Sequence, residues 1–322
     1  MMKTLDCIIF NVEHGFSTFI KSPNDYCLLI DFGRRELFSP VKWIRKHYNA
    51  GNNNIKYYKK RRFAEAIVTH LHLDHFDDVG SLVNEDKPKI LTRDKETLKL
   101  LDKKIKDEKD SSRKDKFEKF KKFSEDYTDD VKSPVDWGFD FFDTKNISYK
   151  DANDCSSSDY KLINNRSYLI GISFAGKKIL IPGDIEKEGW EKAFSYSKIK
   201  KILKDVNFFV ASHHGHKSGI TSEVLKYTGK PDLYLISVAS LDAHVSSFYS
   251  NSENSNGFLV KGDKSKSHSV TTRDRKGSIR ILIKEDSTTT VEIFEADDNL
   301  TKHQKGLLDK RSKKVMRSWK NG

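Results

Sequence analysis

A dense run of metal-binding side chains occupies residues 69–80, THLHLDHFDDVG, directly after the apolar stretch AIV at 66–68. His70 and His72 are two residues apart, a spacing that puts both imidazoles on one side of an extended backbone. A turn after the strand then brings Asp74 and His75 round to the same cavity. Imidazole and carboxylate together suit Zn, Mn or Fe. A solvated polar turn would leave the preceding apolar strand unexplained. The spacing therefore predicts a metal site whose ligands could bind two adjacent ions.

Two later segments also place candidate ligands at the end of an apolar strand. ILIPGD ends on Asp184, and FFVASHHG ends with His213 and His214. A carboxylate such as that of Asp184 can bridge two ions. Three strand ends that present such side chains would form one site at one edge of a sheet.

The elements that must position these residues follow from hydrophobic spacing. LDCIIFNV, FSTFIKS and DYCLLIDFG within residues 5–33 are short apolar runs bounded by Gly, Pro or Asn, which predicts three strands in an antiparallel meander. In residues 35–50, Leu37, Val41, Ile44 and Tyr48 recur at helical spacing, and Pro40 fits a first helical turn. AEAIVTH is the strand that leads into the histidine motif.

The second half of the chain predicts a similar set of elements. SYLIGISFAGKKILIPGD reads as a hairpin that turns at Ala175 and Gly176, and KEGWEKAF as a helix. VNFFVASHHG and DLYLISVAS are predicted strands, and GSIRILI with TTVEIFEA a closing hairpin. Residues 240–269, rich in Ser, Asn and Gly, predict an irregular loop.

Residues 95–126 differ from the rest in composition, being nearly all Lys, Asp and Glu with sparse Leu, Ile and Phe. The apolar residues sit three or four apart, which predicts two amphipathic helices around DSSRKD. This helical insertion is either a solvated addition or a basic arm over a substrate groove. We expect one domain over residues 1–297 and a basic tail at 298–322, which is either a terminal helix or a frayed end.

The charge balance is strongly positive, because 59 Lys and Arg stand against 47 Asp and Glu and give a formal net charge of +12. Clustered cations gain affinity for nucleic acid by releasing phosphate counterions. Drift of exposed positions toward lysine in an AT-biased genome would produce the same excess, so the charge alone leaves both explanations open.

Other bulk features predict a cytoplasmic protein. The chain has no apolar run near the roughly 18 residues that a membrane helix needs. Its start, MMKTLDCIIFNVEHG, has no signal-peptide core. The three cysteines, Cys7, Cys27 and Cys155, are scattered without CxxC spacing, which favours a reducing compartment.

The order of these segments resembles the metallo-β-lactamase-fold hydrolases, whose signature is HxHxDH followed by a later Asp and a later His. Within that superfamily the chain is most similar to the hydrolase domain of ComEC-type competence proteins. The matching segments, in chain order, are NVEHGFSTFI, LLIDFG, IVTHLHLDHFDDV, NNRSYLI, ILIPGDIEKEGW, VASHHGHKSG, PDLYLISVAS and TTRDRKGSI. The resemblance implies an α/β (α+β) fold, a four-layer αββα sandwich that gathers the strand ends at one edge.

The resemblance also implies roles for the candidate ligands. His70 and His72 would hold a first ion, Asp74 and His75 a second, and Asp184 would bridge the two divalent ions (Zn or Mn). His213 is our first choice for the remaining ligand of the second ion and His214 our second. Asp74 would orient the hydroxide that the ions share. His216 and Lys217 would contact phosphate or assist the leaving group, unless Lys217 is an ordinary surface lysine.

The chain also departs from the family pattern. No histidine lies between His75 and Asp184, so the third histidine that many superfamily members give their first metal is missing. Asn164 or Asn165 stands at about the place in the chain where that third histidine would be expected. We therefore expect a ligand-poor first site that tolerates Mn. His244 is either a late active-site residue or a loop histidine. The remaining histidines are expected to be non-ligands: His14, His47, His268 and His303.

The leading functional hypothesis is a metal-dependent phosphodiesterase, a nuclease that cleaves DNA or RNA through a metal-bridged hydroxide. The first alternative is a small-molecule metallohydrolase acting on a lactone, thioester or cyclic nucleotide, because a fold does not fix a function. The second is a non-catalytic metal-binding module. The sequence carries no pattern that indicates a particular protein partner.

Overall fold

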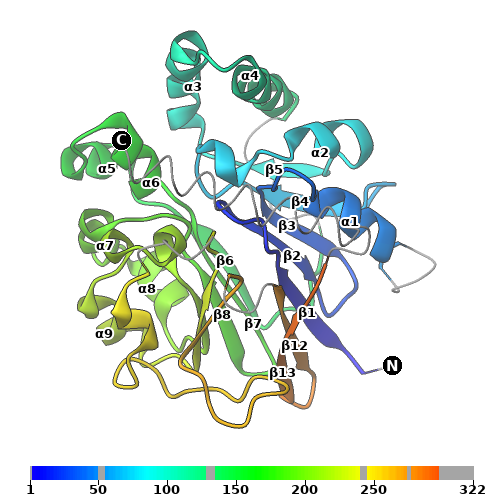
Figure 1. The fold of residues 1–322 in the computed structure, drawn as a ribbon, viewed down its shortest axis with the longest axis vertical. Helices are drawn as coiled ribbons and strands as arrows, with labels where there is room; N and C mark the ends of the chain where they lie inside the picture. Colours follow the sequence, from blue (N-terminus) through cyan, green and yellow to red (C-terminus); the bar gives the residue numbers. More distant parts are fainter. Residues whose placement is uncertain (1, 50–54, 128–134, 240–244, 274–276, 297–322) are drawn as a thin grey trace.

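Two mixed β-sheets form the centre of the computed structural model (Figure 1), which describes residues 2–49, 55–127, 135–239, 245–273 and 277–296. The seven-stranded sheet has the order β13-β12-β1-β2-β3-β4-β5 and the six-stranded sheet the order β11-β10-β9-β8-β7-β6. The strands of the first are β1 Thr4–Ile9, β2 Ser17–Lys21, β3 Cys27–Phe32, β4 Phe63–Ile67, β5 Ile90–Thr92, β12 Ser278–Lys284 and β13 Thr289–Phe294. Those of the second are β6 Phe141–Lys145, β7 Leu169–Phe174, β8 Lys177–Ile181, β9 Phe208–Val210, β10 Leu233–Ile236 and β11 Ser269–Thr271.

Helices cover the outer face of each sheet. The first sheet is covered by α1 Pro40–His47, α2 Val79–Glu85, α3 Lys95–Asp107 and α4 Ser111–Glu125. The second is covered by α5 Tyr149–Cys155, α6 Asp159–Asn165, α7 Lys187–Ala193, α8 Ser197–Leu203 and α9 Leu225–Thr228. Three apolar cores lie between the layers, one under each set of helices and one between the two sheets. The expected four-layer αββα sandwich is thus confirmed.

The central strands are apolar on both sides because both of their faces are covered. In β1, Cys7 and Ile9 point into the core between the sheets, whereas Ile8 points toward the helices of the first layer. Strands buried on both faces read as nearly continuous apolar runs. This explains why IIF and LLI appear without polar interruption.

Most of the predicted long elements are confirmed. The strands β1, β2 and β3 form the antiparallel meander, and β12 pairs with β13 as the closing hairpin. The β7–β8 hairpin turns at Ala175 and Gly176, both with positive φ. Helix α7 lies within the predicted KEGWEKAF segment.

Other expectations need correction or fall outside the described residues. The first helix begins only at Pro40, with Ser39 as its N-cap, and Leu37 is exposed ahead of it. Residues 240–244 and 297–322, and with them His244, His303 and the basic tail, lie outside the described part of the chain. In its described part, the loop predicted at 240–269 contains a short 3-10 turn, Ser247–Ser250, and isolated β-bridges, and its last residue already begins β11.

The predicted helical insertion consists of the helical pair α3–α4. Asp94 and Asp110 cap the two helices by accepting bonds from backbone N–H groups of the first turn. Phe120 is buried, and its ring stacks on that of Phe76, next to the histidine motif, with the ring centroids 4.2 Å apart. An ion pair between Lys116 and Asp77 joins α4 to the same turn. One face of the highly charged helical pair α3–α4 is therefore part of the core.

The described part of the chain contains no helix that combines the length and the hydrophobicity of a membrane span.

Because Phe120 belongs to the core, replacing it should destabilise the whole protein. We expect Phe120→Ala to lower the free energy of unfolding by about 3–5 kcal/mol, the usual effect of truncating a buried phenylalanine. The exposed neighbour Lys119 forms a surface ion pair with Asp115, so Lys119→Ala should change the free energy of unfolding by less than about 1 kcal/mol. Urea denaturation of both variants measures this. Equal, small effects would mean that the helical pair is a detached, solvated addition.

Candidate metal centre

The histidine motif leaves the first sheet at the C-terminal end of β4. Val68 and Thr69 continue beyond the strand, and a short 3-10 turn, Leu73–His75, reverses the chain. The reversal brings the ring of His75 onto that of His70, with 4.0 Å between centroids, and both rings are buried. The structure thus brings the two ends of the motif together, as its spacing predicts.

Asp184 reaches this cluster from the other sheet, where it follows β8. Its carboxylate oxygens lie 3.8 Å from Nε2 of His70 and 3.5 Å from Nε2 of His75. The backbone N–H of Asp184 donates to Oγ of Ser167 at 3.0 Å. Gly183 is needed just before it, because φ is +60° and an added Cβ would lie 2.8 Å from the Ser167 side chain.

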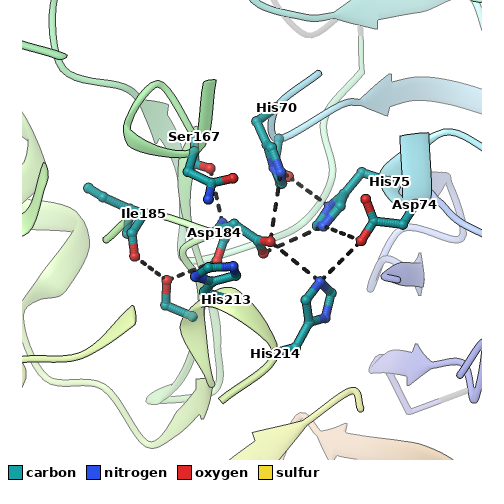
Figure 2. A network of polar contacts seen from close by, with 12 residues as sticks. His70, Asp74, His75, Ser167, Asp184, Ile185, His213 and His214 are labelled. Atoms are coloured by element: carbon teal, nitrogen blue, oxygen red, sulfur yellow. Dashed lines mark hydrogen bonds and ion pairs between the residues drawn. The ribbon is translucent and has the colours of Figure 1, made fainter. Parts of the chain in front are cut away.

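His214 completes the cluster from the end of β9 (Figure 2). Its Nε2 lies 3.3 Å from Asp74 Oδ2 and 3.4 Å from Asp184 Oδ2. Its Nδ1 lies 3.2 Å from the carbonyl oxygen of Ser237. Both His213 and His214 have positive φ, 49° and 52°, a conformation that non-glycine residues rarely adopt.

The neighbouring His213 turns elsewhere. Its Nδ1 lies 2.9 Å from Oγ of Ser218, which is also 2.9 Å from Nδ1 of His216. Sequence reasoning put His213 ahead of His214 as the remaining ligand. The geometry favours the opposite order, because the positive-φ turn directs successive side chains to different places.

Asp74 is held through its backbone by the loops after β1 and β3. Its carbonyl oxygen accepts a hydrogen bond from the N–H of Phe16 at 3.2 Å. A Cβ on Gly15 would come within 2.4 Å of that carbonyl oxygen, and a Cβ on Gly33 within 2.1 Å. The glycines of VEHGFS and LLIDFG therefore allow the motif turn to pack against the sheet.

Asp31 orients His75, and sequence reasoning gave it no role. This buried carboxylate accepts from the N–H and hydroxyl of Thr69 at 2.7 and 2.6 Å, and lies 2.7 Å from Nδ1 of His75. A carboxylate on Nδ1 fixes the imidazole so that Nε2 faces the cluster, as is common for metal-binding histidines. The signal was present, since LLIDFG ends a buried strand beside the motif.

His72 lies at the outer side of the cluster. Its ring meets that of His70 edge-on at 4.9 Å and stacks on Tyr160 of α6 at 4.2 Å between centroids. Its buried Nε2 has no hydrogen-bond partner in the structure. Tyr160, half exposed, was missed because the sequence around it carries no metal-binding pattern.

The buried charges compete strongly at this centre. Burial lowers the pKa of His70 and takes that of His72 down to about 3, so both imidazoles are neutral. Burial also opposes protonation of His214, but Asp184 and Asp74 outweigh it and raise its pKa to about 10. Asp184 is itself buried, and the charges of His214 and His75 still bring its pKa well below 3.8. The ionised carboxylates are therefore stable here only with positive charge close to them.

The donor atoms fit divalent metal ions. Nε2 of His70 and Nε2 of His72 are buried and have no hydrogen-bond partner among the described residues, and Nε2 of His75 and of His214 face carboxylates. Two sets of three ligand atoms lie within 4.8 Å of one another: His70, His75 and Asp184, and Asp74, His75 and His214. A buried polar atom left unpaired is costly, about 1–3 kcal/mol. A shared cation would satisfy these atoms and the carboxylates together.

The other candidates lie around this cluster. Asn164 donates its amide to Glu186 at 2.9 Å, and Asn165 accepts from the N–H of Glu186 at 3.0 Å. His216 follows the β9 turn, and Lys217 after it is exposed. His14, expected to be a non-ligand, stacks on His214 with centroids 5.5 Å apart.

The two remaining described histidines lie in other local contacts. Nδ1 of His47 is 2.9 Å from the carbonyl oxygen of Trp43, and Nδ1 of His268 is 2.7 Å from Oγ of Ser255.

The metallo-beta-lactamase superfamily model matches residues 11–237. That match spans most of the chain and includes every ligand candidate described above, so the chain belongs to the metallo-beta-lactamase superfamily. Membership indicates a metal-dependent hydrolase. A search of curated proteins found no match to the chain.

Because Asp31 fixes the orientation of His75, we expect Asp31→Asn to weaken binding of Zn²⁺ or Mn²⁺ by about 10–100-fold, the usual loss when such a supporting carboxylate is removed. Competition with a chelating dye measures the affinity. Asp154→Asn, on an exposed carboxylate of α5, is the matched control and should bind metal like the wild type. Wild-type affinity in Asp31→Asn would remove the orienting role.

The raised pKa of His214 makes the stability of the metal-free protein depend on pH. The charged imidazole stabilises the fold fully below pH 6.5, and this contribution is lost as pH rises through about 10. We expect the free energy of unfolding to fall more steeply over that window in the wild type than in His214→Asn. Urea titrations with a chelator present test this. Parallel pH profiles would show that His214 is uncharged in the folded state.

Proposed function

We propose that the protein is a metal-dependent phosphodiesterase that cleaves nucleic acid. The centre supports hydrolysis, and the formal net charge of +12 supports a polyanionic substrate. The charge excess favours this substrate once it is taken together with the family resemblance, because neutral lactones have no need of a basic protein. The resemblance to ComEC-type hydrolase domains supports the same choice.

The residues that would hold two Zn or Mn ions are the five whose ligand atoms lie close together, His70, His75, His214, Asp74 and Asp184. His72 would join them from the outer side of the cluster. When bound, such ions supply Lewis acidity and a water that ionises near neutral pH. His75 is held in place by Asp31, and His70 and His72 stay neutral, as ligands must.

Asp74 is the residue that we propose orients the attacking water. It stays ionised because, although burial works against it, His75 and His214 bring its pKa well below 3.8. The N–H of Phe16 donates to its carbonyl oxygen, which holds the backbone of Asp74 beside the cluster. An ionised carboxylate accepts hydrogen bonds only, which suits it to hold a water by its O–H groups. His216 and Lys217, on the turn after His214, remain our proposed phosphate or leaving-group contacts.

Two adjacent histidines offer a matched test. With Mn²⁺ or Zn²⁺ added, the wild type should cut DNA or RNA, and chelation should abolish cleavage. His214→Ala should lose metal and reduce cleavage more than about 100-fold, beyond the range typical of residues that only orient a ligand. His213→Ala should keep both close to wild type, because its ring faces Ser218. Gel assays and elemental analysis of each variant give the two readouts.

Several outcomes would contradict the proposal. A protein that binds metal but cleaves no nucleic acid under any metal would be a hydrolase of another class or a non-catalytic metal-binding module. Binding of nucleic acid should weaken at least ~10-fold between 50 and 200 mM salt. Activity on a small ester that resists the same change would favour the small-molecule alternative. A greater loss in His213→Ala than in His214→Ala would reverse the ligand assignment.

A further inference from the structure

Lys104 differs from the other lysines around it on α3 because it lies on the inner face of the helix. It follows the buried residues Thr97 and Leu101 at helical spacing, whereas Lys103 and Lys106 are exposed. Lysine is rarely buried without a partner. Ordinary surface charge therefore does not explain why a half-buried lysine lies at this position.

The ammonium of Lys104 lies over an aromatic ring that packs next to the histidine motif. It lies 6.0 Å from the ring centroid of Phe117, and Phe117 meets Phe76 edge-on at 5.9 Å. Phe76 is the residue directly after His75, so one layer of aromatic side chains connects the lysine to the histidine motif.

The positive charge of Lys104 and the ligand candidates influence one another's pKa values. After burial, it is the largest influence that lowers the pKa of His72. Burial brings the pKa of Lys104 itself to about 8, with Asp74 acting in the opposite direction. Within the part of the chain that the structure describes, no carboxylate forms an ion pair with its ammonium. Lys104 is thus a cation beside the centre without a dedicated protein partner there.

Helix α6 also contacts the histidine motif, through Tyr160. An ion pair of 2.8 Å between Lys103 and Asp159 joins α3 to α6. Lys104 follows Lys103 in the chain and Tyr160 follows Asp159, so this pair links the helix of Lys104 to the helix of Tyr160. Tyr160 covers the outer side of His72 and remains half exposed. The two helices therefore flank one approach to the histidine motif.

We propose that Lys104 binds a non-bridging phosphate oxygen of the substrate, so that the helical pair α3–α4 forms one wall of the substrate site. This rests on the proposed phosphodiesterase function and specifies the substrate as an anionic phosphodiester. Divalent ions would neutralise Asp74 and Asp184 at the centre, which leaves the ammonium uncompensated. A lysine acts on phosphate as a point charge and needs no further fixed geometry. A neutral ester would gain nothing from it.

The test compares three substitutions at two positions of the same helix. Lys104→Met removes the charge and keeps a long side chain, Lys104→Arg keeps the charge, and Lys106→Met removes an exposed lysine as the matched control. The probes are the p-nitrophenyl ester of thymidine 5′-monophosphate as substrate and thymidine 5′-monophosphate as ligand, both with the Mn²⁺-loaded protein. Thermal unfolding and metal content establish that each variant is folded and loaded.

We expect Lys104→Met to raise KM for the diester and the Kd for the nucleotide about 10-fold, with a smaller change in kcat, as for loss of a charged hydrogen bond. Lys104→Arg should recover most of the loss, and Lys106→Met should match the wild type. In metal-free protein, the nucleotide should also slow acetylation of Lys104, but not of Lys106, as followed by mass spectrometry.

The outcomes separate the two proposals. If the wild type cleaves the diester and Lys104→Met has wild-type KM and Kd, Lys104 does not bind substrate and the phosphodiesterase function stands. If Lys106→Met causes an equal loss, the effect is general surface charge and the assignment falls. If the wild type neither binds the nucleotide nor cleaves the diester, the phosphodiesterase function falls and the assignment falls with it.

Discussion

The concentration of buried and half-buried carboxylates at one sheet edge is the constraint on which the rest of this structure depends. Asp31, Asp74 and Asp184 all approach His75, and two of them also approach His214. Buried negative charges are stable only when positive charge or hydrogen bonds compensate them. Protonated imidazoles serve in the metal-free protein, and divalent cations fit the same donors. The centre is therefore built to exchange protons for metal ions.

The sandwich makes this concentration of charge possible. The ligand candidates come from the ends of β4, β8 and β9, which belong to two different sheets, and only face-to-face packing brings those ends together. On the side of the first sheet, the motif turn packs so closely that Gly15 and Gly33 have no room for a side chain against the carbonyl of Asp74. The apolar core between the sheets, which is remote from the chemistry, thus sets the distances between ligands.

The helical pair α3–α4 shows that a highly charged segment can have an internal role. Its phenylalanines are buried under the first sheet, next to the histidine motif, while most of its lysines stay exposed. The pair is therefore part of the core, and we propose that it is also a wall of the substrate site. The sequence left a solvated addition and a basic arm over a substrate groove as alternatives. Neither one includes the buried face, because opposite faces of one helix have different surroundings.

Sequence patterns alone predicted the long strands, helices α1 and α7, the helical pair α3–α4 and the segments that carry the candidate ligands. The spacing of His70, His72, Asp74 and His75, and the apolar runs that end on Asp184 and His214, are local patterns, and local patterns are what periodicity reports. It did not predict β5, β6 or β11, which are short and lack a strong period. Only the tertiary structure decided which of two adjacent histidines faces the cluster, that Asp31 orients His75, and that Lys104 points inward. Each of these depends on contacts between residues far apart in the chain, or on a positive φ that residue type does not reveal.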